Sequence, residues 1–170
     1  MAEAITRILV PVDFSDHSDL ALRYATRLAE RFNATMEVLH VVDDPFVAGA
    51  WSPEAMAPNI PELLDDLVGA ARKKLADMQA AAIDKGTRFT TRVLTSIVSG
   101  KPADCITDYA RTEPFDLIVM GTHGRTGLSH ALLGSVAERV VRTAPCPVMT
   151  VRDTTLPARE KEPAAAVAVL

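Results

Sequence analysis

The sequence predicts one α/β domain in which helices cover both faces of a parallel β-sheet. Segments typical of strands and of helices alternate along nearly the whole chain, which favours parallel strands joined by crossover helices. The 170 residues are 48% apolar and 24% charged, enough for one well-buried domain. Five strand-like runs are present, and for these we expect the doubly wound order 3-2-1-4-5.

The first half of the domain is predicted as strand, helix, strand. Residues 5–14 are β-branched and apolar, and a proline near their end should stop the hydrogen-bonded ladder. A helix capped by Ser15 or Asp16 should follow, because its apolar residues recur at helical spacing. Asn33 suits the left-handed residue that ends such a helix. The second strand is predicted at residues 36–42.

The second half continues the alternation after a long loop at residues 43–59. This loop contains three prolines and one glycine, and Phe46 and Trp51 make it too apolar for an idle linker. The predicted elements after it are a helix at 61–84, a strand at 88–98, a short helix at 102–111, a strand at 115–120, a helix at 128–142 and a strand at 146–152. Residues 1–152 are therefore assigned to the domain, and residues 153–170 to a tail that is flexible or exchanged with a neighbouring molecule.

A glycine-rich segment follows the predicted fourth strand and leads into a helical pattern. It reads GTHGRTGLSHALLGS, a Gly-x-x-Gly pair followed after nine residues by Gly-Ser. Glycines let a backbone approach an anion, and the unpaired amides at a helix start point toward it. Glycine costs a helix interior about 0.8–1.0 kcal/mol relative to alanine, so Gly134 indicates a helix start or a close approach. Phosphate binding is therefore predicted for Gly121, Gly124, Gly134, Ser135 and Val136. Simple turn glycines are the alternative.

The expected strand order reverses between the first and fourth strands, and sheets of this kind bind ligands at that reversal. The carboxyl ends that meet there are Pro11-Val12-Asp13 and Met120-Gly121-Thr122. The carboxylate of Asp13 could accept hydrogen bonds from a ligand or help to hold a divalent cation. Capping of the next helix is its alternative role. His123 and Arg125 lie in the glycine-rich loop, where they could reach a phosphate or have no role.

Composition and motifs exclude several classes of protein. The net charge of −4 argues against a general nucleic-acid binder, since phosphate affinity comes from clustered Lys and Arg. No stretch approaches the roughly 20 apolar residues of a membrane helix. The N-terminus lacks the pattern of a secretory signal, so a cytoplasmic protein is expected. Neither GxxxxGK[ST] nor GxGxxG after the first strand is present. Cys105 and Cys146 have no base at recognisable spacing and are interpreted as core or loop residues.

Several segments, taken in order, resemble the universal stress protein family over about residues 6–152. They are ILVPVDFS at 8–15, EVLHVV at 37–42, DLIVMGTHGR at 116–125, LLGSVAERV at 132–140 and APCPV at 144–148. Each segment alone is weak, whereas all of them in order and at consistent spacing are highly specific. The resemblance implies a Rossmann-like 3-2-1-4-5 sheet and, for members with this glycine pattern, ATP binding.

The resemblance also implies which residues hold the nucleotide. Pro11, Asp13 and Val41 would surround the adenosine, with Val42 as the alternative to Val41 by one position. The ribose and phosphates would be lined by Met120, Gly121, His123, Gly124, Gly134, Ser135 and Val136. ATP with Mg²⁺ or Mn²⁺ is the expected cofactor, and Asp13 is the candidate metal contact. No catalytic residue is predicted, so an enzyme would be at most a weak ATP hydrolase or would phosphorylate itself, for example at Ser135.

A homodimer is implied as well, and the sequence supplies a physical motive for it. Pro147 to Val151 would form an apolar edge strand without charges, which invites pairing with a second copy. A tail that folds back over this edge is the alternative, and a tetramer is left open. The leading hypothesis is an ATP-binding regulator of an unknown protein partner or of stress tolerance. The alternative of another class is a scaffold that uses loop 43–59 to contact a transporter, with nucleotide optional.

Overall fold

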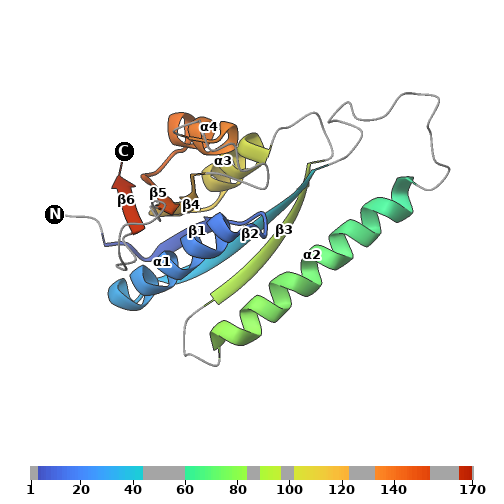
Figure 1. The fold of residues 1–170 in the computed structure, drawn as a ribbon, viewed down its shortest axis with the longest axis horizontal. Coiled ribbons are helices and arrows are strands. Elements are labelled where there is room, and N and C mark those ends of the chain that lie inside the picture. Colours follow the sequence, from blue (N-terminus) through green and yellow to red (C-terminus); the bar gives the residue numbers. More distant parts are fainter. Residues whose placement is uncertain are drawn as a thin grey trace, which may run out of the picture.

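In the part of the chain that the structure describes, six strands form one sheet between two layers of helices (Figure 1). The computed structural model describes residues 4–43, 60–83, 89–96, 102–122, 133–153 and 165–169. The strands are β1 (Arg7–Pro11), β2 (Thr35–Asp43), β3 (Phe89–Ser96), β4 (Leu117–Gly121), β5 (Val148–Asp153) and β6 (Ala165–Val169). Their order across the sheet is β3-β2-β1-β4-β5-β6. The predicted α/β class with a parallel sheet is thus confirmed.

The first five strands run parallel, and the direction in which strands are added reverses at β1. β1 pairs with β2 through the register Arg7↔Thr35 and with β4 through Ile8↔Leu117. β2 in turn pairs with β3, and β4 pairs with β5. The carboxyl ends of β1 and β4 therefore lie side by side at the reversal, which is where doubly wound sheets hold ligands.

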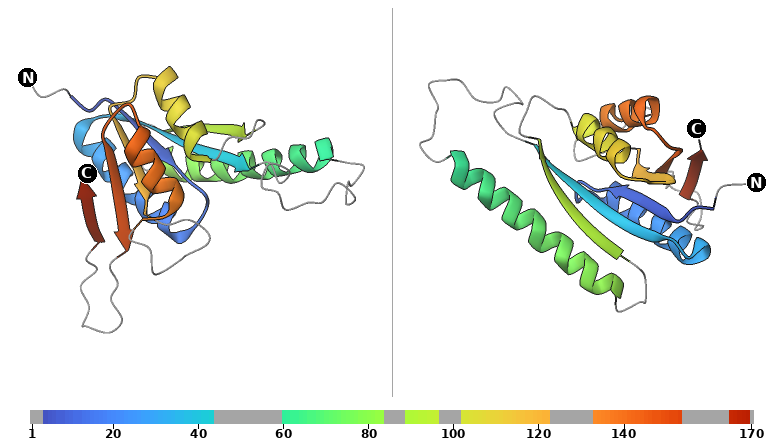
Figure 2. Two further views of the ribbon diagram at one scale, coloured as in Figure 1. Left: turned by 90° about the horizontal axis from the view of Figure 1, so that it is seen from above. Right: turned by 180° about the vertical axis from the view of Figure 1, so that it is seen from behind.

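Of the helices within the described ranges, two cover each face of the sheet (Figure 1, Figure 2). The first pair is α1 (Asp16–Phe32) and α2 (Ile60–Ile83), and the opposite pair is α3 (Pro102–Thr112) and α4 (Ser135–Thr143). Alternate residues of β1 divide between the two layers. Ile8 and Val10 pack on the side of α1 and α2, Leu9 packs on the side of α3 and α4, and all three are fully buried. The apolar run of β1 is therefore explained by burial on both faces.

The helices begin and end at residues with identifiable capping roles. Ser15 is the N-cap of α1, and its hydroxyl accepts the N–H of Ser18 at 3.3 Å. Asn33 ends this helix with a φ of 56°, in the left-handed conformation that its sequence position predicted. Among the helices in the described part of the chain, none is both long enough and apolar enough to cross a membrane.

The start predicted for the fourth long helix is wrong. α4 begins at Ser135 and not near residue 128, because Leu133 and Gly134 lie outside the helix and Gly134 is its N-cap. The helical spacing of apolar residues upstream of the glycine suggested the earlier start. The extra cost of glycine inside a helix favoured the later one, and the later start is observed. Loop 43–59 lies outside the described residues apart from Asp43.

Part of the tail forms β6 on the chain's own sheet, as in the alternative of a tail that folds back over the edge of β5. This strand runs antiparallel to β5, from Met149↔Val169 to Asp153↔Ala165, so the sheet is mixed. The unpaired backbone groups of an apolar edge strand favour the addition of another strand. The sequence of β6, AAVAV, contains no charge, glycine or proline that would oppose pairing. The chain itself therefore occupies the edge that was predicted to pair with a second copy.

Candidate functional site

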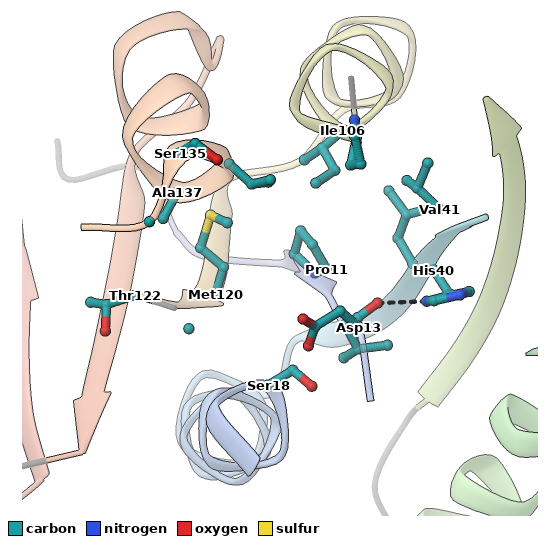
Figure 3. A pocket seen from close by; sticks show the side chains of 16 residues that line it. Pro11, Asp13, Ser18, His40, Val41, Ile106, Met120, Thr122, Ser135 and Ala137 are labelled. Carbon is teal, nitrogen blue, oxygen red and sulfur yellow. Dashed lines mark hydrogen bonds between the residues drawn. The ribbon is translucent and has the colours of Figure 1, made fainter. Parts of the chain in front are cut away.

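A cavity of about 290 Å³ opens at the carboxyl ends of β1, β2 and β4 (Figure 3). Nine of the twelve predicted site residues line it: Pro11, Val12, Asp13, Val41, Met120, Gly121, Gly134, Ser135 and Val136. The other three, His123, Gly124 and Arg125, lie outside the described residues. The structure thus brings together residues from three strands and a helix start, as expected at the reversal of a doubly wound sheet.

Seven further residues line the cavity and were not among the predicted site residues, although Thr122 was expected at this edge of the sheet. They are Ser18, Leu39, His40, Pro102, Ile106, Thr122 and Ala137. Leu39 and His40 directly precede Val41 at the end of β2, so their position in that strand could have identified them. Pro102 and Ile106 belong to α3, and no local pattern indicates that this helix closes the cavity.

One part of the cavity is apolar. Figure 3 shows Val41, Ile106 and Met120 around the open space, with Ile106 contributed by α3 and the other two by strands. Ile106 and Met120 are nearly buried, at 3% and 5% exposure. Walls of this kind, with a few polar groups at one side, are typical of small-molecule sites.

The start of α4 supplies the polar side. Gly134 is its N-cap, with φ −69° and ψ 156°, and it makes no side-chain cap hydrogen bond. Its own N–H donates to the carbonyl of Thr122 at 2.7 Å, and the first bond of the helical ladder runs from the N–H of Glu138 to the carbonyl of Gly134. The amides of Ser135, Val136 and Ala137 precede that bond, so the helix leaves them for another acceptor. The positive end of the helix dipole adds to their attraction for an anion.

An ion pair between α3 and α4 helps to fix this helix start beside the cavity. Nε of Arg139 donates to Oδ1 of Asp104 at 2.6 Å. Asp104 lies in the first turn of α3, close to the cavity residues Pro102 and Ile106. The two helix starts are therefore linked through side chains that do not line the cavity.

Gly121 is explained by packing as well as by its place in the motif. A β-carbon on Gly121 would lie 2.9 Å from the backbone carbonyl oxygen of His17 and 3.1 Å from its β-carbon. The end of a flexible side chain could move aside to relieve so close a contact, whereas backbone atoms cannot. Gly121 is thus needed where the end of β4 meets the start of α1, whatever it does toward a ligand.

Asp13 lies on the cavity wall and does not cap α1 itself. Its Oδ1 accepts the N–H of Ser15 at 3.1 Å and the hydroxyl of Ser15 at 2.6 Å, while Ser15 is the N-cap residue. In Figure 3, Asp13 and Ser18 lie on the side of α1, opposite Ser135 and Ala137 of α4. The carboxylate is thus held by the turn that leads into α1 and is part of the cavity wall.

The turn between Asp13 and Ser15 passes through a left-handed residue, Phe14, with a φ of 63°. This conformation costs a residue with a β-carbon about 1–2 kcal/mol, so surrounding contacts must hold it. The Phe14 ring packs on His40 with 4.3 Å between ring centroids, and the Lys74 ammonium lies 4.8 Å from the Phe14 centroid. Nδ1 of His40 is 2.8 Å from the carbonyl oxygen of Val12. Because a carbonyl only accepts, Nδ1 carries the proton.

The two cysteines do not have the surroundings of reactive thiols. Both are free and partly buried, and Cys146 packs against the core on the side of α3 and α4. Burial raises the pKa of the Cys146 thiol, and the negative charge of Asp116 raises it further. A raised pKa lowers the thiolate fraction at neutral pH, which agrees with a structural role. Among the described residues, no group of three or more His, Cys, Asp or Glu could hold a metal ion.

Comparison with known proteins assigns the fold and the family. Residues 4–152 match the Universal stress protein family. A universal stress protein of Methanocaldococcus jannaschii is 38% identical over 151 residues, covering 86% of this chain and 81% of that protein. The structure of universal stress protein UspA from Lactobacillus plantarum is 34% identical with a TM-score of 0.73, covering 87% of this chain and 98% of that one.

Two more distant structures of the same fold contain adenine nucleotides. One is a universal stress protein in complex with cAMP, 24% identical with a TM-score of 0.63, covering 88% of this chain and 98% of that one. The other is a universal stress protein from Archaeoglobus fulgidus in complex with dAMP, 23% identical with a TM-score of 0.59, covering 87% and 98%. Some proteins of this fold therefore bind adenine nucleotides.

Proposed function

The chain belongs to the universal stress protein family, and we propose that it binds ATP in the cavity at the carboxyl ends of β1, β2 and β4. The observation that carries the proposal is that an apolar pocket adjoins the start of α4, where no side chain caps the backbone amides. An adenine ring suits the apolar part, while a phosphate chain suits the amides that precede the helical ladder. The complexes of similar proteins with cAMP and dAMP support an adenine nucleotide as the ligand.

The proposed binding mode gives each part of the nucleotide a set of residues. The base and ribose lie between Pro11, Val41 and Met120, with the Asp13 carboxylate accepting from ribose hydroxyls. The phosphates lie on the amides of Ser135 and Val136, and the sequence adds His123, Gly124 and Arg125 of the glycine-rich loop. A Mg²⁺ or Mn²⁺ ion would be held mainly by phosphate oxygens, with Asp13 as a protein ligand.

Binding, and not rapid hydrolysis, is the activity that we propose. Among the described residues that line the cavity, Asp13 is the only carboxylate and His40 the only imidazole. In the proposed binding mode both side chains lie on the base and ribose side of the cavity, away from the phosphates at the start of α4, where Oδ1 of Asp13 is held by Ser15 and the Nδ1–H of His40 donates to a backbone carbonyl. General base catalysis needs such a group within reach of the attacking oxygen. We therefore propose a regulator whose nucleotide state is sensed by a protein partner in the stress response.

Substitution at Gly134 tests the proposed phosphate site. The backbone there is extended, so residues with side chains can adopt it, and Asp or Asn at an N-cap supports a helix at least as well as Gly does. We expect Gly134→Asp to weaken ATP binding by about tenfold or more relative to Gly134→Asn, because only Asp adds a negative charge beside the phosphates. Isothermal titration calorimetry with ATP measures the difference. Equal affinities of the two variants would contradict phosphate binding at this helix start.

We also propose that two copies form a dimer through β5, with β6 displaced from its edge. The strand segment Pro147 to Val151 has no charge, and β6 is joined to β5 through an intervening tail of 11 residues, 154–164. A second copy would offer the same edge in a two-fold arrangement. The dimer therefore competes with β6 for one set of backbone groups.

A further inference from the structure

We propose that Phe14 and Lys74 are positioning residues that hold the Asp13 carboxylate at the cavity and couple helix α2 to nucleotide binding. The inference rests on the proposed nucleotide site. Neither residue lines the cavity, whereas their neighbours Val12, Asp13 and His40 do. Their effect on a ligand would therefore be exerted through the turn.

Phe14 is held in its unusual conformation by contacts on its ring. One contact is with the ring of His40, at 4.3 Å between centroids with the planes tilted by 37°. A second is with the Lys74 ammonium, 4.8 Å from the Phe14 centroid, within the range of a cation–π interaction, and the side chain also packs against the core on the side of α1 and α2. Without these contacts, the β-carbon of residue 14 would favour a φ below zero. The ring contacts thus hold the backbone that precedes the N-cap of α1.

The hydrogen bonds around Phe14 carry this constraint to the cavity. Asp13, directly before Phe14, accepts from both the N–H and the hydroxyl of Ser15, directly after it. In the observed structure the two groups meet across the left-handed turn at Phe14. On the other side, the His40 ring that packs on Phe14 is hydrogen-bonded to the carbonyl of Val12. A change at Phe14 would therefore move a carboxylate and a carbonyl of the cavity wall.

Lys74 connects this turn to α2. It is exposed, and it lies next to Leu75, which is 1% exposed and packs in the core on the side of α1 and α2. The Lys74 ammonium links α2 to the ring of Phe14, next to the cavity residue Asp13. A partner that shifts α2 or binds the Lys74 ammonium would thus change the turn that holds Asp13, and nucleotide binding would change the environment of Lys74 in return.

Substitutions of Phe14 separate its conformation from its bulk. Phe14→Ala removes the ring but keeps the β-carbon, so the turn should relax. Phe14→Gly also removes the ring but adopts the left-handed conformation freely. We expect the alanine variant to bind ATP about tenfold more weakly than the glycine variant, measured by calorimetry at a temperature at which both are folded. Loss of packing alone predicts equal binding, and that result would overturn the role of Phe14.

The ligand-free protein gives a second readout. The N–H of Ser15 donates to Asp13 and the N–H of Ser18 donates to the Ser15 hydroxyl, so hydrogen exchange at these amides reports whether the turn is kept. We expect faster exchange in Phe14→Ala than in Phe14→Gly. If the unchanged protein does not bind ATP, the proposed function and the role in binding both fail, while exchange still decides whether the ring holds the turn. Equal rates of hydrogen exchange in the two variants would show that the Phe14 ring does not hold the turn.

Lys74 has a matched control in Lys73, its exposed neighbour on α2. Lys74→Gln and Lys73→Gln remove the same charge, so a general electrostatic attraction for ATP would weaken binding equally in both. We expect Lys74→Gln to weaken ATP binding about threefold and Lys73→Gln to leave it unchanged, consistent with the modest strength of an exposed cation–π contact. Equal affinities of the two variants would overturn the coupling through Lys74.

Discussion

The backbone carbonyl oxygen of His17 lies 2.9 Å from the position that a β-carbon on Gly121 would occupy. The first turn of α1 therefore packs directly on the end of β4, with no room for a side chain between them. This contact joins two chain segments that both contribute residues to the cavity wall. It also gives the first glycine of the phosphate motif a structural role in the absence of ligand.

We expect Gly121→Ala to destabilise the protein by about 1–3 kcal/mol, as overpacked sites do. The added methyl group meets backbone atoms of α1, so the helix start or the strand end must shift. Urea unfolding followed by circular dichroism measures the free energy of unfolding. Loss of ATP binding in this variant would not by itself identify a phosphate contact, and for that reason Gly134 is the better position for the functional test.

Gly69 is the matched control for this substitution. It lies exposed in α2, and a β-carbon there would meet nothing within 4 Å. Gly69→Ala should stabilise the protein by about 0.5–1 kcal/mol, because alanine has the higher helix propensity. Equal effects of alanine at positions 69 and 121 would show that the close contact with His17 is absent in solution.

The Asp116 side chain, just before β4, accepts hydrogen bonds from residues at the start of β1. Ionisation of this carboxyl group should therefore contribute to stability. Its Oδ2 accepts the N–H of Thr6 at 2.7 Å, the hydroxyl of Thr6 at 2.8 Å and the N–H of Arg7 at 2.9 Å. The hydrogen bond from the Thr6 N–H lowers the pKa of Asp116 most, burial partly opposes it, and the Thr6 hydroxyl, the Arg7 N–H and the Arg7 charge lower it further. The folded pKa therefore lies below the ordinary value of 3.8.

We expect Asp116→Asn to destabilise the protein by about 1 kcal/mol at pH 7, where the carboxylate is ionised in both the folded and unfolded states. Because the folded pKa is lowered, this contribution is present above pH 3.8 and is lost as the pH falls through the folded pKa. Urea unfolding at pH 7, 5 and 3.5 should thus show that the difference in free energy of unfolding between the wild-type protein and Asp116→Asn becomes smaller only at the lowest pH. Asp108→Asn, at an exposed ion pair with Arg111, is the control, with little expected effect. The same difference in free energy of unfolding at all three pH values would contradict the role of ionisation.

Removal of residues 154–170 should strengthen dimer formation, because it exposes the edge of β5 that β6 occupies. Analytical ultracentrifugation of the full and shortened chains over a range of concentrations measures the dissociation constants. A second comparison keeps the chain length. Val167→Pro disrupts β6 at its pairing with Val151, whereas Lys161→Pro changes a position outside that strand. Dimers of equal strength in all four proteins, or a dimer that needs the tail, would refute competition between β6 and a second copy.

Local patterns in the sequence were sufficient for the class of fold and for the position of most candidate residues. The alternation of strand and helix patterns predicted the parallel sheet, because a chain that buries both faces of each strand needs crossover helices. The spacing of Gly121, Gly134 and Ser135 after the fourth strand predicted where the cavity lies. The family resemblance is confirmed, while ATP binding, the metal and the dimer remain predictions.

Only the tertiary structure decided which distant segments meet. Ile106 lines the cavity because α3 packs on the sheet beside α4, and Lys74 reaches Phe14 because α2 lies on the same face as α1. The ring of Phe14 likewise meets His40 and Lys74, which are far away in the sequence. Hydrophobic period and turn chemistry are properties of neighbouring residues and can be read along the chain. Contacts between segments depend on how helices settle against the sheet, and no local pattern encodes that arrangement.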